Sequence, residues 1–128
     1  MRLPETLPTN IDGRREVHVL ELPPCCPVSK NPRPGSFIMI CYRPQGIVLE
    51  VGALYAYIHQ FRGGLRDETG EIVIRDMEGM IARIAQDCAD AVDVPVSVCA
   101  DLVIAPKQRM LLTVRCKPFL CKYRLLQR

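Results

Sequence analysis

No stretch of this sequence approaches the ~18 consecutive apolar residues that a membrane-spanning helix requires. The opening residues, MRLPETLPTN, also lack the apolar segment of a secretory signal. We therefore expect a cytoplasmic protein that makes no membrane contact. Internal repeats and low-complexity segments are absent too. A chain of 128 residues with 48% hydrophobic content is long enough for one domain with a single core.

The net charge is small, and the chain has few histidines. The net charge of +3 is too small to indicate nucleic-acid binding by itself. The two histidines, His18 and His59, fall on a predicted strand and a predicted helix, without the paired spacing of zinc ligands. Zinc stays an alternative only through Cys116 and Cys121, together with the cysteine pair described below. Otherwise we expect no metal cofactor.

The spacing of apolar residues predicts the secondary structure. Polar and apolar residues alternate from Glu16 to Leu22, which predicts a half-buried strand with Val17 and Val19 on its apolar side. Apolar residues at helical spacing predict one helix over 51–61 and a second that starts near Met77 and stops before Pro95. The other predicted strands are 36–42, 96–103 and 110–114.

This ββααββ order predicts an α+β fold with a four-stranded antiparallel sheet and both helices on one face. The edges and the other face of the sheet would then be open for assembly. We expect three parts along the chain. Residues 1–14 form an N-terminal arm, residues 15–116 the folded domain, and residues 117–128 a basic tail.

The most informative segment is 24–30 (PCCPVSK). A flanking proline has a fixed φ and no N–H, so the chain must leave regular structure here while the thiols stay firmly placed. This favours a cysteine that is presented to a substrate, although a turn with two buried or idle cysteines is the simpler alternative. The seven cysteines are an odd number, which excludes a fully paired disulfide framework within one chain.

Several short motifs in this order resemble a known family, the tunnelling-fold (T-fold) enzymes of 7-deazapurine metabolism. The similarity is to the QueF nitrile reductase and the QueF-like archaeosine synthase, and it spans roughly residues 15–116. The motifs are 26–30 (CPVSK), Arg43-Pro44, Leu49-Glu50, 61–63 (FRG) and a glutamate that opens the second helix.

The resemblance implies roles for individual residues. Cys26 matches the cysteine that attacks the nitrile carbon to form a thioimide, and Cys25 is the weaker candidate. Asp76 and Glu78 compete for the position of the glutamate that binds the guanine-like edge. Counting back from the end of the second helix favours Glu78. A carboxylate accepts two N–H donors from that edge as a charge-assisted pair. Glu50 is a further candidate substrate-binding residue.

The sequence also departs from the family pattern. The nicotinamide-phosphate motif, of Glu-Ser-Lys-Ser type, is replaced by 50–53 (EVGA), so we do not expect NADPH as a cofactor. The general-acid aspartate beyond the nucleophile is missing, and the segment 31–35 carries Arg33 instead. The histidine before the base-binding glutamate is Met77.

These departures suggest changed chemistry at the 7-substituent. An arginine in place of the acid removes a proton donor and adds a fixed cation. The pocket would then suit an anionic group, with Arg33 or Arg75 pairing with the carboxylate of 7-carboxy-7-deazaguanine. Our first hypothesis is decarboxylation at C7, with Cys26 as the proton donor or a close neighbour.

Two alternatives to this hypothesis stay open. Cys26 could form a thioimide with 7-cyano-7-deazaguanine, as in an amidinotransferase, or the chain could be a non-catalytic 7-deazaguanine-binding module. The substrate could be a base, a nucleotide or a modified nucleic acid. The resemblance also implies self-association into a homo-oligomeric barrel. Tyr57 and Phe61 are predicted to be core residues, although they and Tyr55 could stack on a base.

Overall fold

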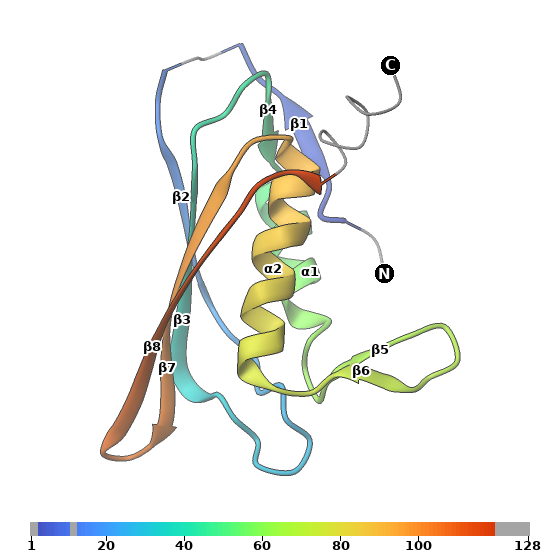
Figure 1. Ribbon diagram of the computed structural model, residues 1–128, viewed down its shortest axis with the longest axis vertical. Coiled ribbons are helices and arrows are strands. Elements are labelled where there is room, and N and C mark those ends of the chain that lie inside the picture. Colours follow the sequence, from blue (N-terminus) through green and yellow to red (C-terminus); the bar gives the residue numbers. More distant parts are fainter. Residues whose placement is uncertain (1–2, 11–12, 120–128) are drawn as a thin grey trace.

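The computed structural model describes residues 3–10 and 13–119, which form an α+β domain. Its main sheet is antiparallel, with strand order β2-β3-β7-β8, and both helices lie on one face (Figure 1). The four strands are β2 (Glu16–Glu21), β3 (Arg33–Tyr42), β7 (Val96–Ala105) and β8 (Gln108–Cys116). The predicted fold class and antiparallel sheet are therefore confirmed.

The two helices start at side-chain caps and bury one face each. In α1 (Val51–His59), Glu50 caps the first turn, and Leu54, Tyr57 and Ile58 are buried. In α2 (Met77–Val92), Asp76 is the N-cap, and the chain leaves the helix at Asp93 in the left-handed conformation (φ 59°). The buried stripe of α2 follows the spacing of three and four residues that the sequence predicts. Besides Asp87, it comprises the apolar residues Met80, Ile81, Ile84, Ala85, Cys88, Ala89 and Val92.

Side chains alternate strictly between the two faces of the sheet. Ile38 and Ile40 of β3 and Val98 of β7 face the helices and are fully buried. On the opposite face, Phe37 and Met39 are 44% and 46% exposed. The core thus fills the layer between the sheet and the helices, and an apolar outer face is left uncovered.

One expectation about β2 is wrong. Val17 and Val19 lie on the outer face, 40% and 62% exposed, whereas Glu16 and His18 are turned toward the helices. The reason is a polar cluster that these two residues form with Tyr42, the register partner of Glu16 in β3. Hydrogen bonding within this cluster offsets the cost of burying polar groups on the inner face.

Four short strands go beyond the predicted pattern. In the N-terminal arm, β1 (Thr6–Pro8) pairs with β4 (Ile47–Leu49). A small hairpin of β5 (Leu65–Arg66) and β6 (Ile72–Ile74) projects away from the body of the domain (Figure 1). Neither described helix has the length and apolar character needed to cross a membrane.

A buried hydrogen-bond network joins the two helices. Tyr57 Oη donates to Asp87 Oδ2 at 2.6 Å, and Arg83 Nε donates to both oxygens of the same carboxylate at 3.0 and 3.1 Å. Burial, followed by the nearby Asp87 charge, raises the pKa of Tyr57, so the phenol stays protonated and acts as the donor. Tyr57 and Phe61 are 2% and 0% exposed, which confirms them as core residues.

The substitution Tyr57→Phe removes the hydroxyl that donates to Asp87 Oδ2, so this buried carboxylate oxygen loses one hydrogen bond. We expect a loss of about 1–3 kcal/mol in the free energy of unfolding, measured by urea denaturation. The control is Tyr55→Phe, because Tyr55 lies on the same helix and is 60% exposed; it should change stability by less than about 0.5 kcal/mol. Equal effects of the two variants would contradict a stabilising role for the Tyr57–Asp87 bond.

Candidate functional site

The cysteine segment forms a closed loop between β2 and β3. The N–H groups of Cys25 and Cys26 both donate to the Asn31 carbonyl, at 2.8 and 2.9 Å, and Lys30 N–H donates to the Cys26 carbonyl at 2.9 Å. Lys30 has a positive φ of 64°, which turns the chain back on itself. The prolines around the cysteines end the strand, as the sequence predicts, and these backbone bonds then fix the loop. We call residues 25–31 the cysteine loop.

The two adjacent thiols lie in opposite environments. Cys25 is fully buried, and its Sγ donates to the backbone carbonyl of Asp76 at 3.8 Å. Burial, followed by the charges of Asp76 and Cys26, raises the pKa of Cys25 to about 11, so this thiol is unreactive at neutral pH. Cys26 is partly exposed, and its Sγ accepts the Ser29 N–H at 3.3 Å. Hydrogen bonds from the Ser29 side chain and from nearby backbone N–H groups lower the pKa of Cys26.

The cysteine loop contacts two other segments that the sequence singles out. Gly63 N–H donates at 2.9 Å to the carbonyl of Pro24, the residue directly before the loop, which holds the end of the 61–63 motif against the start of the loop. The Cys25–Asp76 contact holds the loop against the first turn of α2. Three motifs that are far apart in the sequence therefore meet at one end of the sheet.

At the start of α2, the structure distinguishes Asp76 from Glu78. Asp76 is the N-cap, and its carboxylate accepts the Gly79 N–H at 3.1 Å. Glu78 lies in the first turn and is exposed. A carboxylate that caps a helix is already engaged by backbone donors. Glu78 is thus the better placed of the two to receive donors from a ligand.

The remaining predicted site residues are more scattered. Arg33 opens β3 directly after the cysteine loop, and its Nε donates to the Ile104 carbonyl at 2.9 Å. Arg75 is exposed and precedes the α2 cap. Glu50 caps α1 by accepting the Gly52 and Ala53 N–H groups, which lower the pKa of its carboxyl. Glu50 lies at the opposite end of α1 from the 61–63 motif, so one chain does not bring it together with Cys26.

The cysteines do not gather into a metal site in the part of the chain that the structure describes, where no group of three or more His, Cys, Asp or Glu ligands occurs. Cys116 pairs in register with Val96, beyond the end of α2, whereas Cys25 contacts the start of that helix. The 16 residues of α2 separate these ends by about 24 Å. Cys121 lies outside the described residues, as do Lys122, Arg124 and Arg128 of the basic tail.

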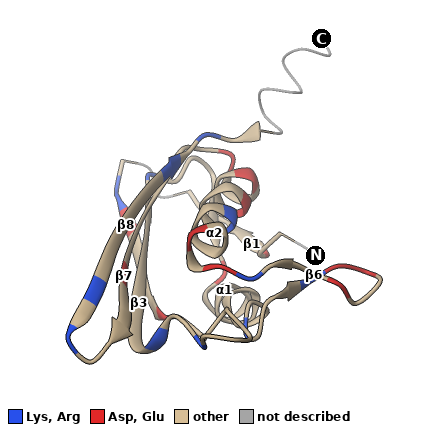
Figure 2. Ribbon diagram, turned by 60° about the horizontal axis from the view of Figure 1, so that its bottom comes forward, with Lys and Arg blue, Asp and Glu red and all other residues tan. Residues whose placement is uncertain are grey.

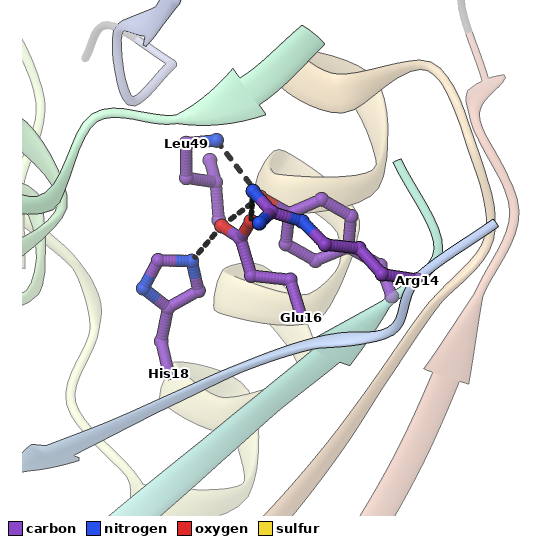
Figure 3. Close-up of polar contacts among 5 residues, drawn as sticks. Arg14, Glu16, His18 and Leu49 are labelled. Carbon is purple, nitrogen blue, oxygen red and sulfur yellow. Dashed lines mark hydrogen bonds and ion pairs between the residues drawn. The ribbon is translucent and has the colours of Figure 1, made fainter. Parts of the chain in front are cut away.

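Sequence reasoning missed a polar cluster at the other end of β2 and β3 (Figure 3). Glu16 Oε1 accepts from Tyr42 Oη at 2.8 Å and contacts His18 Nε2 at 2.7 Å. Tyr42 Oη in turn accepts the Leu49 N–H at 2.8 Å, and burial raises the pKa of this phenol. Arg14 Nη2 lies 3.7 Å from Glu16 Oε2. The available signal was two polar residues, Glu16 and His18, on one side of a predicted strand.

Comparison with protein-family models gives no match, and comparison with curated proteins gives none at a significant level. Function must therefore be inferred from the residues and their geometry.

The contrast between the two thiols gives a direct test. In the native protein, Cys26 should react with iodoacetamide much faster than Cys25, and the pH midpoint of its reaction rate should lie below that of a free cysteine, because a lower pKa yields thiolate at lower pH. Peptide mapping by mass spectrometry measures the rate at each site. Ser29→Ala should move the midpoint upward by removing the hydroxyl. Equal labelling of Cys25 and Cys26 would rule out the assigned environments.

Proposed function

We propose that this chain is a T-fold enzyme that acts on the 7-substituent of a 7-deazaguanine without NADPH. The reaction we propose is decarboxylation of 7-carboxy-7-deazaguanine as a base, nucleotide or polymer-linked base. The observation that carries the proposal is the contact between Cys25 Sγ and the Asp76 carbonyl at 3.8 Å. This contact joins the residue before Cys26 to the N-cap of the helix whose first turn bears Glu78, which supports a single site that contacts the substrate at two edges.

The roles divide by chemistry. The exposed Glu78 carboxylate accepts two N–H donors from the guanine-like edge, while Asp76 stays engaged in its cap. Arg75, next to the same turn, pairs with the carboxylate of the substrate. Arg33 supplies a second cation through its terminal nitrogens, because only its Nε is used by the Ile104 carbonyl.

The proposed step transfers one proton and releases carbon dioxide. The bond between C7 and the carboxylate breaks, its electron pair stays on C7, and the Cys26 thiol supplies the proton that C7 takes up. The thiolate then regains a proton from water. The hydrogen bonds that lower the pKa of Cys26 stabilise the thiolate left by this transfer.

The same lowered pKa favours a second candidate function, nitrile chemistry through a thioimide. Here the Cys26 thiolate adds to the nitrile carbon of 7-cyano-7-deazaguanine, and the nitrile nitrogen takes up a proton. An amine then displaces the thiolate and leaves an amidine. This route uses Cys26 as a nucleophile rather than as an acid.

The two functions are separated by incubating the purified protein with each substrate. For decarboxylation we expect release of labelled carbon dioxide from the 7-carboxy compound, abolished in Cys26→Ala and reduced at least about tenfold in Glu78→Gln, the loss of one charge-assisted contact. The matched controls are Cys116→Ala and Glu71→Gln, which should keep full activity.

A stable adduct with 7-cyano-7-deazaguanine in intact-protein mass spectra, lost in Cys26→Ala, would instead support the nitrile reaction. Tight binding of several 7-deazaguanines with neither carbon dioxide nor an adduct would leave a non-catalytic binding module and sink both enzymatic proposals. Full activity of Cys26→Ala and Glu78→Gln would place the reaction elsewhere.

We also propose that the chain assembles with copies of itself into a barrel. In the single chain, β2 and β8 are the edges of the main sheet. The outer face carries exposed apolar side chains, among them Val19 (62% exposed) and Leu111 (77% exposed). Edge strands with unpaired backbone groups and an apolar face are ready to pair with a second copy.

The oligomer is tested with Val19→Glu, because a charge on the edge strand β2 opposes assembly while leaving the core of the single chain intact. Analytical ultracentrifugation should show an oligomer for the natural sequence and a smaller species for Val19→Glu. Val51→Glu is the control, since Val51 is similarly exposed (68%) but starts α1. A natural protein that sediments as a monomer would end this proposal without affecting the test of chemistry.

A further inference from the structure

A cleft opens on the outer face of the sheet, at the end remote from the cysteine loop. Its volume is about 570 Å³, within the range of roughly 300–1,000 Å³ that small-molecule sites occupy. It is bordered by the 43–45 turn and by the 93–95 segment that links α2 to β7. The side chains that matter here are Arg15, Arg43, Arg115, Met39, Cys41 and Cys99.

Two of the arginines come from the edges of the sheet and reach the central strands. Arg15 Nε donates to Cys41 Sγ of β3 at 2.8 Å. Arg115 of β8 extends Nη1 toward Ser97 Oγ of β7 at 3.5 Å. Cys41 and Ser97 are direct partners in the β3–β7 register. Both guanidinium groups therefore reach the same cross-strand pair, from opposite sides.

The third arginine lies close to the first in the fold. The last pair of the β2–β3 register is Glu16 with Tyr42, and Arg15 and Arg43 are the residues directly before Glu16 and directly after Tyr42. Both side chains are exposed and line the cleft. Like charges held near one another at the end of a sheet repel. An anion bound between them would turn this repulsion into attraction.

Neighbouring arginines show the usual alternative, which is pairing with a carboxylate. Arg14 lies near Glu16 (Figure 3), and Arg109, on the same strand and face as Arg115, donates to Asp101 Oδ1 at 3.0 Å. Figure 2 shows basic residues toward both ends of β8. Within residues 3–10 and 13–119, the arginines of the cleft form no ion pair. Asp93 is the one acidic residue that lines the cleft, and its Oδ1 is buried and has no hydrogen-bond partner among the described residues.

We propose that this cleft binds the phosphate group of a nucleotide. Arginine offers a planar fork of donors that matches phosphate oxygens, and three such groups around one opening suit a doubly charged anion. A phosphate alone would fill only part of the volume. Met39 and Cys99 supply an apolar floor for the organic part of the ligand. The site lies at the other end of the sheet from Cys26, so the proposal is independent of the function proposed above.

The phosphate can belong to a free nucleotide or to a nucleic-acid backbone, and the experiment separates these sources. The probes are adenosine 5′-monophosphate, which lacks the guanine edge that Glu78 would bind, and a fluorescein-labelled single-stranded oligonucleotide. Titration calorimetry and anisotropy measure their affinities for the full chain. If the ligand is a nucleic-acid backbone, the affinity should fall steeply as the salt concentration rises, because binding to several phosphates releases their counterions.

We expect Arg43→Gln and Arg115→Gln each to lower the affinity for adenosine 5′-monophosphate by about tenfold, because each variant loses one charge-assisted contact. Adenosine lacks the phosphate. Its affinity for the natural protein should be no higher than the affinity of adenosine 5′-monophosphate for these variants. Arg109→Gln is the matched control and should change affinity less than about twofold, because its guanidinium is paired with Asp101. In NMR spectra, the Nε–H signals of Arg15 and Arg115 should shift on binding.

Three results would overturn the proposal. One is no shift of the arginine signals by either phosphate probe at millimolar concentration. Another is an equal loss of affinity in Arg109→Gln, which would indicate attraction to overall charge. The third is adenosine binding as tightly as its monophosphate. Arg115→Lys guards against an effect on folding, since it should keep the fold and part of the affinity.

Discussion

Burial of α2 against the inner side chains of β3 and β7 is the interaction on which the rest of the molecule depends. The buried face of the helix is apolar except for Asp87, and the central strands meet it with Ile38, Ile40 and Val98, all fully buried. Because strand side chains alternate with a period of two residues, fixing this inner face also fixes the outer face. Both candidate binding regions follow from that one arrangement, one at each end of the sheet.

The elements that the sequence predicts well are those whose pattern is local and long. The spacing of Met80, Ile84 and Cys88 defines α2 without reference to any other segment, and the apolar run 36–42 marks a central strand. Strands of two or three residues, such as β1 and β5, carry too few positions for a pattern. The inverted face of β2 had another cause, because the half-buried Glu16 accepts a hydrogen bond from Tyr42, which lies 26 residues away.

The candidate site divides in the same way. Local chemistry was enough to predict a presented thiol, since prolines flank the cysteine pair. It could not predict which thiol is buried, because Cys25 is held by Asp76, 51 residues further along the chain. The outer cleft lay beyond sequence reasoning altogether. Arg15 and Arg115 belong to opposite edges of the sheet, and only the lateral register of β2, β3, β7 and β8 brings them together.

Asp76 performs two tasks with different atoms. Its carboxylate caps α2 by accepting the Gly79 N–H, and its carbonyl accepts the Cys25 thiol. Fraying of the first turn of α2 would therefore break the contact between this helix and the cysteine loop, and the loop would then be held by its own backbone bonds and by the Gly63–Pro24 bond. The position of the cysteine loop relative to the helices thus depends in part on the end of a helix to which Cys26 itself does not belong.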